Sequence, residues 1–585
     1  MSLAKKAEDW IYAGTLEALQ KEGSKVIKGG IAVFYHENRV YAVDNRCPHL
    51  GFPLHLGDLC EGILTCHWHH ARFDVCSGGT LDPWADDVPS HEVTCENGEV
   101  WVNPRPRQER SYEKYVHRLR EGLEQNIGIV IAKAVVGLLE SGFPAADIAR
   151  IGIEFGTGFA GGWNSGLTIL TAMTRVLPKL DRTGQILALY QGLLHVARSG
   201  SGRAEHRSLS RLPGEETAQD RLTAWYRNCV EVRDTQGAER ILLTSIAKGA
   251  TDEELADMML LAVTDHFYLD GGHTLDFHNK AFEALGWADA GQRVKILTSL
   301  VPLLSNPRRS EELHHWQAPV NLVAPLKEAF GQLEAAAPGS RRPLGTDEEE
   351  RILEALLGDE PLDTATLLTG VITEGGDPVQ LAQLVALAAA ERIVRFHTQN
   401  DFGDWIAVLH TFTHAHAVHE TLRRSSHPPL MRAVYYSAVS VYLDRFLNVP
   451  AASRPKADGS DVAGNPEEPL EPLNGRRRVS EAAAWVSRYI KGGGDRGTLI
   501  NTLGHASLRE DAEFHTFQMY EAAVAEYEGW ERRSDAFAER AKETPAAGGG
   551  PLSGGTRPDR ARDSAYRPYR MAAAPGREAV RGAVV

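Results

Sequence analysis

The sequence predicts a multidomain protein in which a small all-β domain precedes a large all-α domain. The chain has 585 residues, which is too long for one ordinary hydrophobic core, so at least two domains are expected. Residues 1–104 alternate apolar and polar side chains with the period of two that is typical of strands. From about residue 110 the chain changes to Ala- and Leu-rich segments with helical spacing. We therefore expect a β domain at 1–104, a helical domain at 110–540 and a flexible basic tail at 544–585.

Two hairpins are expected in the β domain. The first pairs residues 31–35 with residues 40–43 across a Glu37-Asn38 turn, and the second pairs 90–95 with 99–102. The second hairpin turns at Asn97-Gly98, a dipeptide preferred in type I′ turns because both central residues need a positive φ.

The helical domain shows its clearest periodicity at residues 112–139, 186–197 and 382–396. Two stretches lose this periodicity and are rich in Pro, Gly and charged residues, one at 337–350 and one at about 451–478. We expect both to be disordered insertions, because neither carries enough apolar side chains to pack.

Composition excludes several classes of protein. The formal net charge of −15 argues against a nucleic-acid-binding body, and no apolar run reaches the roughly 18 residues that a membrane-spanning helix needs. The start of the chain has no apolar segment of the kind found in signal peptides, so secretion is not expected. Six cysteines in so long a chain suit a reducing cytoplasm better than a disulfide framework. We expect a cytoplasmic protein.

Two short loops carry a set of four metal ligands, Cys47-Pro48-His49 and Cys66-His67-Trp68-His69. Two thiolates and two imidazoles suit a [2Fe–2S] cluster in which histidines replace cysteines on one iron. Cys47 and Cys66 are then expected on one iron, and His49 and His69 on the other. A structural zinc ion is the alternative, but zinc fingers usually pair Cys with Cys, whereas each loop here mixes one Cys with one His.

Three segments carry a family resemblance: Cys47-Pro-His49-Leu-Gly51, Cys66-His-Trp-His69-His-Ala-Arg-Phe-Asp74 and Ser77-Gly-Gly79. With them, residues 1–104 resemble Rieske-type ferredoxins and the Rieske domain of ring-hydroxylating oxygenases. The resemblance implies a [2Fe–2S] cluster that carries single electrons. It also implies the soluble, oxygenase- or nitrite-reductase-associated type, because Phe52 and Trp68 occupy the positions of the extra disulfide of respiratory Rieske proteins.

The second loop departs from this family at two positions. His67 stands where the family often has Pro, and His70 where it usually has Gly, so His70 is expected to adopt a strained φ. His55, His67 and His70 are expected at the surface or beside the ligands, and not as ligands. The remaining cysteines are expected as small buried residues, namely Cys60, Cys76, Cys95 and Cys229.

Degenerate repeats in the helical domain place three histidines in equivalent positions. His273-Thr274 with Glu283 aligns without gaps on His410-Thr411 with Glu420, and His515-Thr516 repeats the opening. If the repeats are real, His273, His410 and His515 converge on one cavity. The alternative is that Leu- and Ala-rich helices merely look alike, and that these histidines bind no metal.

Two candidate acceptors for the electrons follow. One is Asp270-x2-His273-x4-His278, which resembles the mononuclear-iron motif of ring-hydroxylating oxygenase α subunits and requires an antiparallel sheet and a distant carboxylate. The other is the helix His410–Glu420, in which His410 and His414 share a face, as do His416 and either His419 or Glu420. Further members of such a site are expected among His195, Asp265, His266 and Glu513.

We expect an oxidoreductase, with O2 dependence, that receives electrons from a reductase or ferredoxin and delivers them to a helical site or a partner. The catalytic residue stays open among His273, His278, His410, His414 and His515, with iron as the second metal and a small organic substrate. Two alternatives remain. One is a non-catalytic redox carrier or sensor with a helical interaction scaffold, and the other is an oxygenase α subunit with mononuclear iron at His273 and His278.

Overall fold

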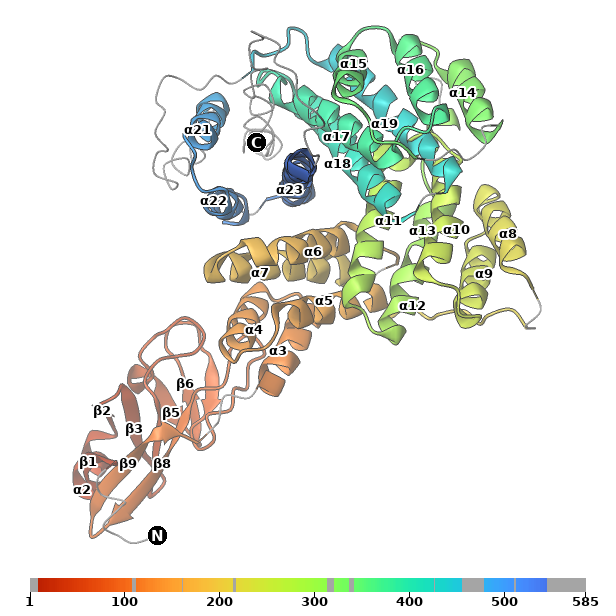
Figure 1. Ribbon diagram of the computed structural model, residues 1–585. Coiled ribbons are helices and arrows are strands. Elements are labelled where there is room, and N and C mark those ends of the chain that lie inside the picture. Colours follow the sequence, from red (N-terminus) through yellow and green to blue (C-terminus); the bar gives the residue numbers. More distant parts are fainter. Residues whose placement is uncertain are drawn as a thin grey trace. The chain divides into compact units, whose positions relative to one another are not determined.

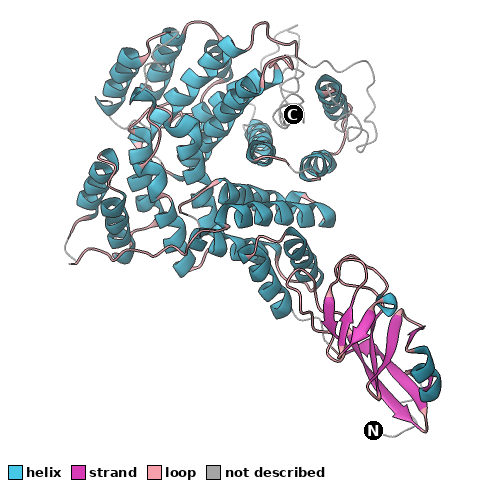
Figure 2. Cartoon of the chain, turned by 180° about the vertical axis from the view of Figure 1, so that it is seen from behind, coloured by secondary structure: helices cyan, strands magenta, loops and turns pink. Residues whose placement is uncertain are grey.

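In the computed structural model the chain divides into two compact units, Met1–Pro144 and Ala145–Val585. The strands belong to the first unit, and helices make up the second (Figures 1 and 2). The fold class expected from the sequence is confirmed. The structure describes residues 9–107, 112–159, 161–213, 217–312, 320–335, 341–425, 427–454, 478–509 and 512–543. The expected tail at 544–585 and residues 455–477 of the expected insertion lie outside these ranges.

Two antiparallel sheets form the first unit. One has six strands in the order β1-β9-β8-β4-β3-β2, and the other has three in the order β5-β6-β7. The strands are β1 Ile11–Thr15, β2 Ser24–Ile27, β3 Ile31–His36, β4 Arg39–Asp44, β5 Asp58–Cys60, β6 Ile63–Thr65, β7 Arg72–Asp74, β8 Ser90–Glu96 and β9 Glu99–Pro106. The helices are α2 Leu16–Glu22, the short 3-10 turn η1 Leu54–Leu56, α3 Tyr112–Glu124 and α4 Gly128–Glu140.

Both predicted hairpins are present. Strands β3 and β4 join through Glu37 and Asn38, and strands β8 and β9 through Asn97 and Gly98. All four turn residues have positive φ, between 49° and 83°, as the tight turns of twisted hairpins require. The period-two pattern was therefore a correct guide to this sheet.

The expectation for the remaining cysteines is wrong in the first unit. Cys60, Cys76 and Cys95 are exposed, and Cys229 of the second unit is partly buried. The reason is position, because Cys60 ends the short strand β5 and Cys95 lies beside the turn of the β8–β9 hairpin. Small size alone does not place a cysteine in a core.

In its described residues the second unit consists of helices and the turns and loops that connect them. Its α-helices are α5 Ala145–Phe159, α6 Ser165–Val176, α7 Arg182–Gly200, α8 Gln219–Glu231, α9 Thr235–Ala247, α10 Asp252–Thr264, α11 His273–Ala284, α12 Ala290–Ser299, α13 Val301–Ser305, α14 Val323–Ala335, α15 Thr346–Leu357, α16 Pro361–Thr373, α17 Pro378–Val394, α18 Phe402–Arg424, α19 Met431–Leu443, α21 Val479–Lys491, α22 Arg496–Leu508 and α23 Phe514–Glu543. Short 3-10 turns are η2 Leu177–Lys179, η3 Leu269–Gly272, η4 Leu285–Trp287, η5 Ser310–Glu312, η7 Pro428–Leu430 and η8 Asp444–Leu447. None of the described helices is both long and apolar enough to cross a bilayer.

The disorder expected at 337–350 is wrong for its described part, residues 341–350. Arg342 donates both guanidinium nitrogens to Glu348, at 2.7 and 2.8 Å, and helix α15 begins at Thr346. The acidic residues that suggested a solvated insertion occupy the first turn of this helix, where the helix dipole favours negative charge.

Helices α6, α11, α18 and α23 form the part of the second unit that matters for function. Helix α18 packs against both α11 and α23, and α6 packs against both of the same helices, so the four close a ring. Figure 1 shows that these helices come from widely separated parts of the chain. Their inward faces carry polar residues that are almost fully buried, which is unusual for a helix core and marks a candidate site.

Candidate metal centres

The two predicted ligand loops of the first unit have the same backbone closure. The amide of Cys47 donates to the carbonyl of Phe52 at 2.8 Å, and the amide of Cys66 donates to the carbonyl of Ala71 at 2.8 Å. The fourth residue after each cysteine donates back to that cysteine's carbonyl, Gly51 at 2.8 Å and His70 at 3.0 Å. Sequence spacing alone did not reveal this internal equivalence.

Four candidate ligands meet between these loops. Cys47 and Cys66 are 2% and 1% exposed, and their thiols lie close enough to hydrogen-bond to each other. The rings of His49 and His69 meet edge to face, with centroids 4.9 Å apart. His49 Nδ1 is buried and has no hydrogen-bond partner among the described residues, so it is free to bind a metal. His69 is exposed, which places one edge of the site at the surface.

Burial shapes the chemistry of these ligands. Burial and, to a smaller extent, the neighbouring Cys66 raise the pKa of the Cys47 thiol to about 11. Burial also lowers the pKa of His49, together with His69 and Lys133. A neutral imidazole is the form that binds metal, and two adjacent buried thiols need a cation to become thiolates. The donor set therefore fits an iron–sulfur cluster.

Aromatic side chains join the two loops at the positions where the respiratory family has its disulfide. The rings of Phe52 and Trp68 lie 5.8 Å apart, so this contact links the loops without a covalent bond. Trp84, which the sequence did not single out, meets the ring of His49 edge to face at 4.7 Å. The site is thus held by packing as well as by backbone hydrogen bonds.

The other histidines of this region lie around the site. His67 pairs with Asp58 at 2.9 Å and is exposed, and His55 Nδ1 donates to Asn45 Oδ1 at 2.9 Å. His70 has a φ of 61°, the left-handed conformation that favours glycine. The expected strain at His70 is confirmed, and Gly51 occupies the same place in the first loop with a φ of 89°.

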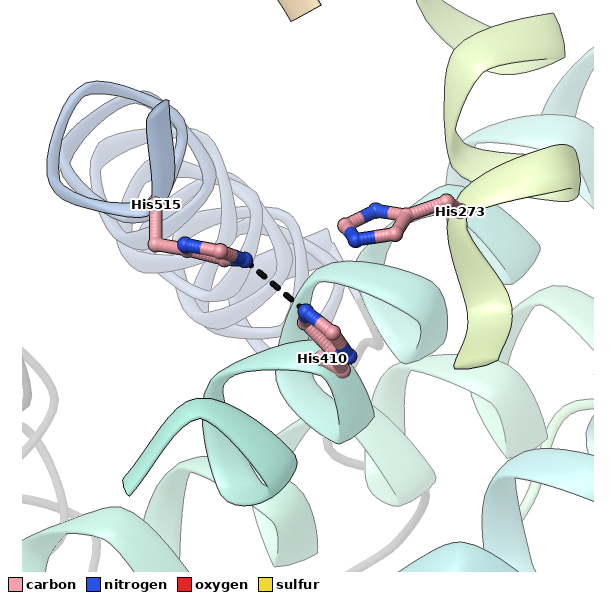
Figure 3. A group of neighbouring side chains, drawn as sticks. All are labelled: His273, His410 and His515. Carbon is pink, nitrogen blue, oxygen red and sulfur yellow. Dashed lines mark hydrogen bonds between the residues drawn. The ribbon is translucent and has the colours of Figure 1, made fainter. Parts of the chain in front are cut away.

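Three histidines of the second unit converge as the repeats predicted. Figure 3 shows His273 from α11, His410 from α18 and His515 from α23 with their rings turned toward one another. One nitrogen from each can be chosen so that all three lie within 4.8 Å of one another, and His410 Nε2 lies 2.8 Å from His515 Nε2. Their ring centroids are 4.2 Å apart for His273 and His410 and 5.8 Å apart for His273 and His515.

Burial keeps these imidazoles neutral. It lowers the pKa of His273 and of His515 to about 4, and that of His410 to about 2 with further contributions from His273 and His515. Three neutral imidazoles on three rigid helices make a donor set of the kind that holds a transition metal while leaving coordination positions open.

The turn that precedes His273 has a strained backbone and positions this histidine beside the other two. Tyr268 and Asp270 both have a φ of 49°, and Gly271 and Gly272 follow at 67° and 95°. A Cβ on Gly271 would come 3.3 Å from His410 Nδ1, so glycine allows the turn to approach the histidines closely. Backbone strain of this kind is concentrated at functional sites.

Two of the predicted ligands do not join the group. His414 points elsewhere, with its Nδ1 at 2.8 Å from Ser437 Oγ, and His278 Nδ1 donates to the carbonyl of Thr274 at 2.6 Å. The predicted pairing of His410 with His414 is therefore wrong. One helical turn brings two side chains to one face, but it does not turn both rings to the same point.

The mononuclear-iron alternative at His273 and His278 does not fit this geometry. Both residues lie on helix α11, and every described strand belongs to residues 11–106. The antiparallel sheet that this alternative requires is thus missing around His273 in the described part of the chain. Asp265, the other member of the motif region, pairs with Arg227 at 2.6 Å and with Arg432 at 3.0 Å.

The remaining candidates also lie outside the group. His266 pairs with Glu231 at 2.7 Å, and the ring of His195 meets Phe517 at 5.7 Å. Glu513 contributes its carbonyl to the amide of Thr516 at 3.1 Å. His416 and His419 do share one partner, as their spacing suggested, because both Nδ1 atoms lie 2.8 Å from Glu526 Oε1.

A second polar layer lies one helical turn beyond the three histidines. Asp276 follows His273 by three residues, Gln518 follows His515 by three, and each is 1% exposed. Burial raises the pKa of Asp276 to about 7, against the opposing effects of Gln518 and Lys280. Neither residue is a ligand position of a sequence motif, so this pair could not be predicted from the sequence.

A third layer consists of buried ion pairs. Arg175 of α6 contacts Glu283 at 2.5 Å, Glu521 at 3.2 Å and Glu420 at 3.6 Å. Lys280, which is fully buried, pairs with Glu283 at 3.0 Å and with Glu521. His416, Glu283 and Glu521 also lie close enough to hold a metal, but the two cations already compensate these carboxylates.

The order of these layers along the chain shows the relative direction of helices α11, α18 and α23. The histidine precedes the glutamate on each helix, at 273 and 283 on α11, at 410 and 420 on α18, and at 515 and 521 on α23. Because the histidines meet at one level and the glutamates at another, the three helices run in the same direction. A continuous buried polar column therefore leads from the three histidines to the ion pairs.

The family match lies within the first unit. Residues 9–92 match the family model described as the Rieske [2Fe-2S] domain. The chain is 34% identical over 99 residues to the ferredoxin component of the naphthalene 1,2-dioxygenase/salicylate 5-hydroxylase systems of Ralstonia sp, covering 16% of this chain and 95% of that protein. It is 38% identical over 84 residues to the vanillate O-demethylase oxygenase subunit of a Pseudomonas species, covering 13% of this chain and 23% of that protein. The solved ferredoxin of carbazole 1,9a-dioxygenase from Nocardioides aromaticivorans is 26% identical with a TM-score of 0.16, covering 17% of this chain and 100% of that one.

Proposed function

The chain belongs, through residues 9–92, to the Rieske [2Fe-2S] domain family, and from this premise we propose that it is an oxidoreductase component that carries single electrons to a metal held in its own helical unit. The observation that carries the second half of this proposal is the convergence of His273, His410 and His515. The first half depends on the buried ligand loops of the N-terminal unit.

The roles of the cluster ligands follow from their burial. The buried Cys47 and Cys66 would supply two thiolates to one iron of a [2Fe–2S] cluster, and His49 and His69 would supply two imidazoles to the other. When bound, a [2Fe–2S] cluster takes up and releases one electron at a time. The exposed edge at His69 and Trp68 gives a donor protein access to this site, while the buried thiols exclude water from the other side.

The helical site has the features of an acceptor for these electrons. Imidazole ligands suit iron, copper, nickel and zinc, and among these a redox-active metal is required to accept an electron. We infer iron, with three histidines as ligands and the remaining positions open to O2 or a small organic substrate. Asp276 and Gln518 lie next along the polar column, where a buried carboxyl group can hold a proton for the reaction.

The partner classes follow from the relatives. The Ralstonia relative is a ferredoxin component of dioxygenase and hydroxylase systems. By this likeness, the electron donor to the present chain is a reductase or another ferredoxin. The proposed substrate is a small organic molecule, by likeness to the dioxygenase and hydroxylase systems to which this relative belongs.

Metal analysis of the purified full chain tests the proposal. We expect about three irons and about two labile sulfides for each chain, with a Rieske-type EPR signal after dithionite reduction. His410→Ala is expected to lose one iron and to keep the signal. His414→Ala is the matched control, because His414 lies one turn away on the same helix without joining the group, and it is expected to keep all three irons.

Two results would contradict the helical acceptor. Two irons for each chain, with no further metal after anaerobic Fe(II) addition, would leave a redox carrier or sensor whose helical unit is an interaction scaffold. Zinc in the third position, unchanged by growth in iron-rich medium, would exclude electron acceptance there. Absence of iron and sulfide after attempted reconstitution would exclude the cluster as well.

A further inference from the structure

Helix α4 reaches the first ligand loop of the N-terminal unit through one lysine. Lys133 Nζ donates to the carbonyl oxygens of Pro48 and His49, the second at 3.0 Å. Its ammonium group also lies 3.5 Å from Asp86 Oδ2. The lysine is therefore fixed beside the backbone of a cluster ligand, and its charge is close enough to lower the pKa of His49.

The helical hairpin α3–α4 is held in place by further polar contacts. Arg118 of α3 donates to the carbonyl oxygens of Pro83 and Ala85, at 2.9 and 2.8 Å, and pairs with Asp86 at 3.2 Å. Lys114 pairs with Asp87 at 2.8 Å. These contacts hold the loop that carries Trp84, whose ring packs against the ring of His49.

This hairpin is not part of the matched family domain. The family match ends at residue 92, whereas α3 and α4 span Tyr112–Glu124 and Gly128–Glu140. Within residues 9–92 the ligand loops are flanked by strands and by the turn η1, whereas Lys133 lies beyond the matched domain.

We propose that Lys133 is a positioning residue that fixes the first ligand loop and raises the reduction potential of the cluster held there. The inference rests on the proposed cluster at Cys47, His49, Cys66 and His69. Reduction adds one negative charge to the site, and a fixed cation nearby stabilises that charge. The two carbonyl oxygens hold the ammonium group close to His49, and the carboxylate of Asp86, 3.5 Å from the ammonium group, offsets part of its field.

The test compares reduction potentials of full-length holoprotein variants by EPR-monitored redox titration. The ratio of reduced to oxidised cluster is compared at the midpoint potential of the wild-type protein. We expect Lys133→Met to lower this ratio about three- to tenfold. A tenfold change corresponds to about 59 mV for a one-electron couple. Lys114→Met is the matched control, since it removes a cation from the same hairpin without touching the ligand loop, and we expect less than a twofold change. Iron and sulfide contents are measured first, so that only loaded protein is compared.

Two more variants keep the test decisive if Lys133→Met fails to load. Asp86→Asn removes the carboxylate beside the ammonium group and is expected to shift the ratio in the opposite direction, toward reduced cluster. Lys133→Arg retains charge and donors and is expected to stay within twofold of wild type. The proposal is overturned if both variants load their cluster and neither changes the ratio of reduced to oxidised cluster. If Lys133→Met does not load, an unchanged ratio in Asp86→Asn overturns it. Wild-type protein without a cluster would instead overturn the proposed function.

Discussion

The two candidate metal centres differ in how the chain assembles them. The four candidate ligands of the N-terminal unit lie between residues 47 and 69, on two loops with the same backbone closure. The three histidines of the helical unit lie at 273, 410 and 515, on three helices. The first centre is encoded by local spacing, whereas the second exists only when distant helices pack in one direction.

The surroundings of the two centres differ as well. The first centre has an exposed edge at Trp68 and His69, and its support consists of backbone hydrogen bonds and aromatic contacts. The second is backed by a buried column of polar and charged side chains that includes Asp276 and Lys280. An exposed edge suits exchange of electrons with another protein, while a buried polar column suits chemistry that also needs protons.

The largest expected effect tests whether the two centres are independent. Cys66→Ala removes one of two thiolates, so we expect complete loss of labile sulfide and of the Rieske-type EPR signal. The metal proposed for the helical unit is expected to remain, because its candidate ligands come from α11, α18 and α23. Iron and sulfide analysis of the purified variant checks both statements, with Cys95→Ala, an exposed cysteine of the same unit, as the control. Simultaneous loss of all metal would show that the comparison is wrong and that one centre depends on the other.

The buried charges of the helical unit give the next largest effect. Lys280→Met leaves Glu283 and Glu521 facing each other with less compensation, and breaking a buried pair in this way costs about 3–5 kcal/mol. Urea unfolding followed by helical circular dichroism measures the loss. The control Lys179→Met breaks the partly exposed pair with Glu528 and is expected to cost less than about 1 kcal/mol. Equal losses in the two variants would mean that the polar column does not stabilise the helical unit.

The same contrast explains what the sequence could predict. Hairpins, ligand loops and the strain at His70 follow from local rules, namely the period of strands, turn preferences and metal-ligand spacing. The convergence of His273, His410 and His515 was predicted only through degenerate repeats. The pairing of His410 with His414 failed because helical spacing brings Cβ atoms to one face without fixing the direction of the rings. Lys133, Trp84 and Asp276 had no sequence signal, since their roles depend on tertiary contacts.

A pH-dependent effect follows from Asp276. Burial raises its pKa to about 7, so between pH 5 and 7 the folded chain keeps a proton that the unfolded chain has already released. Stability therefore falls as pH rises through this window, by about 2–3 kcal/mol for this one group. Asp276→Asn does not ionise, so we expect its unfolding free energy relative to wild type to rise by that amount between pH 5 and 7.

Parallel urea titrations of both proteins at several pH values measure this difference. The groups that face Asp276 are Gln518, Lys280, His416 and Glu521, and they are present in both proteins. Their own pH dependence largely cancels in the comparison. A constant difference from pH 5 to 7 would show that Asp276 is ionised in the folded chain and holds no proton beside the three histidines.

The smallest effect concerns the equivalence of the two ligand loops. Gly51 and His70 hold the same position after their cysteines, and both have left-handed φ values, 89° and 61°. A left-handed φ costs glycine almost nothing but costs histidine about 1 kcal/mol, so glycine at position 70 stabilises the folded chain. Glycine also has more conformational freedom in the unfolded chain, and this offsets part of the stabilisation. We expect His70→Gly to stabilise the N-terminal unit by about 0.5 kcal/mol, measured as urea unfolding of the loaded protein followed by the visible absorbance of the cluster.

His67→Gly is the control, because His67 lies in the same loop with a negative φ, so that glycine there is expected to destabilise the unit by about 0.5–1 kcal/mol. If both substitutions destabilised the unit equally, the left-handed φ of His70 would carry no measurable strain, and the two ligand loops would not differ in this respect.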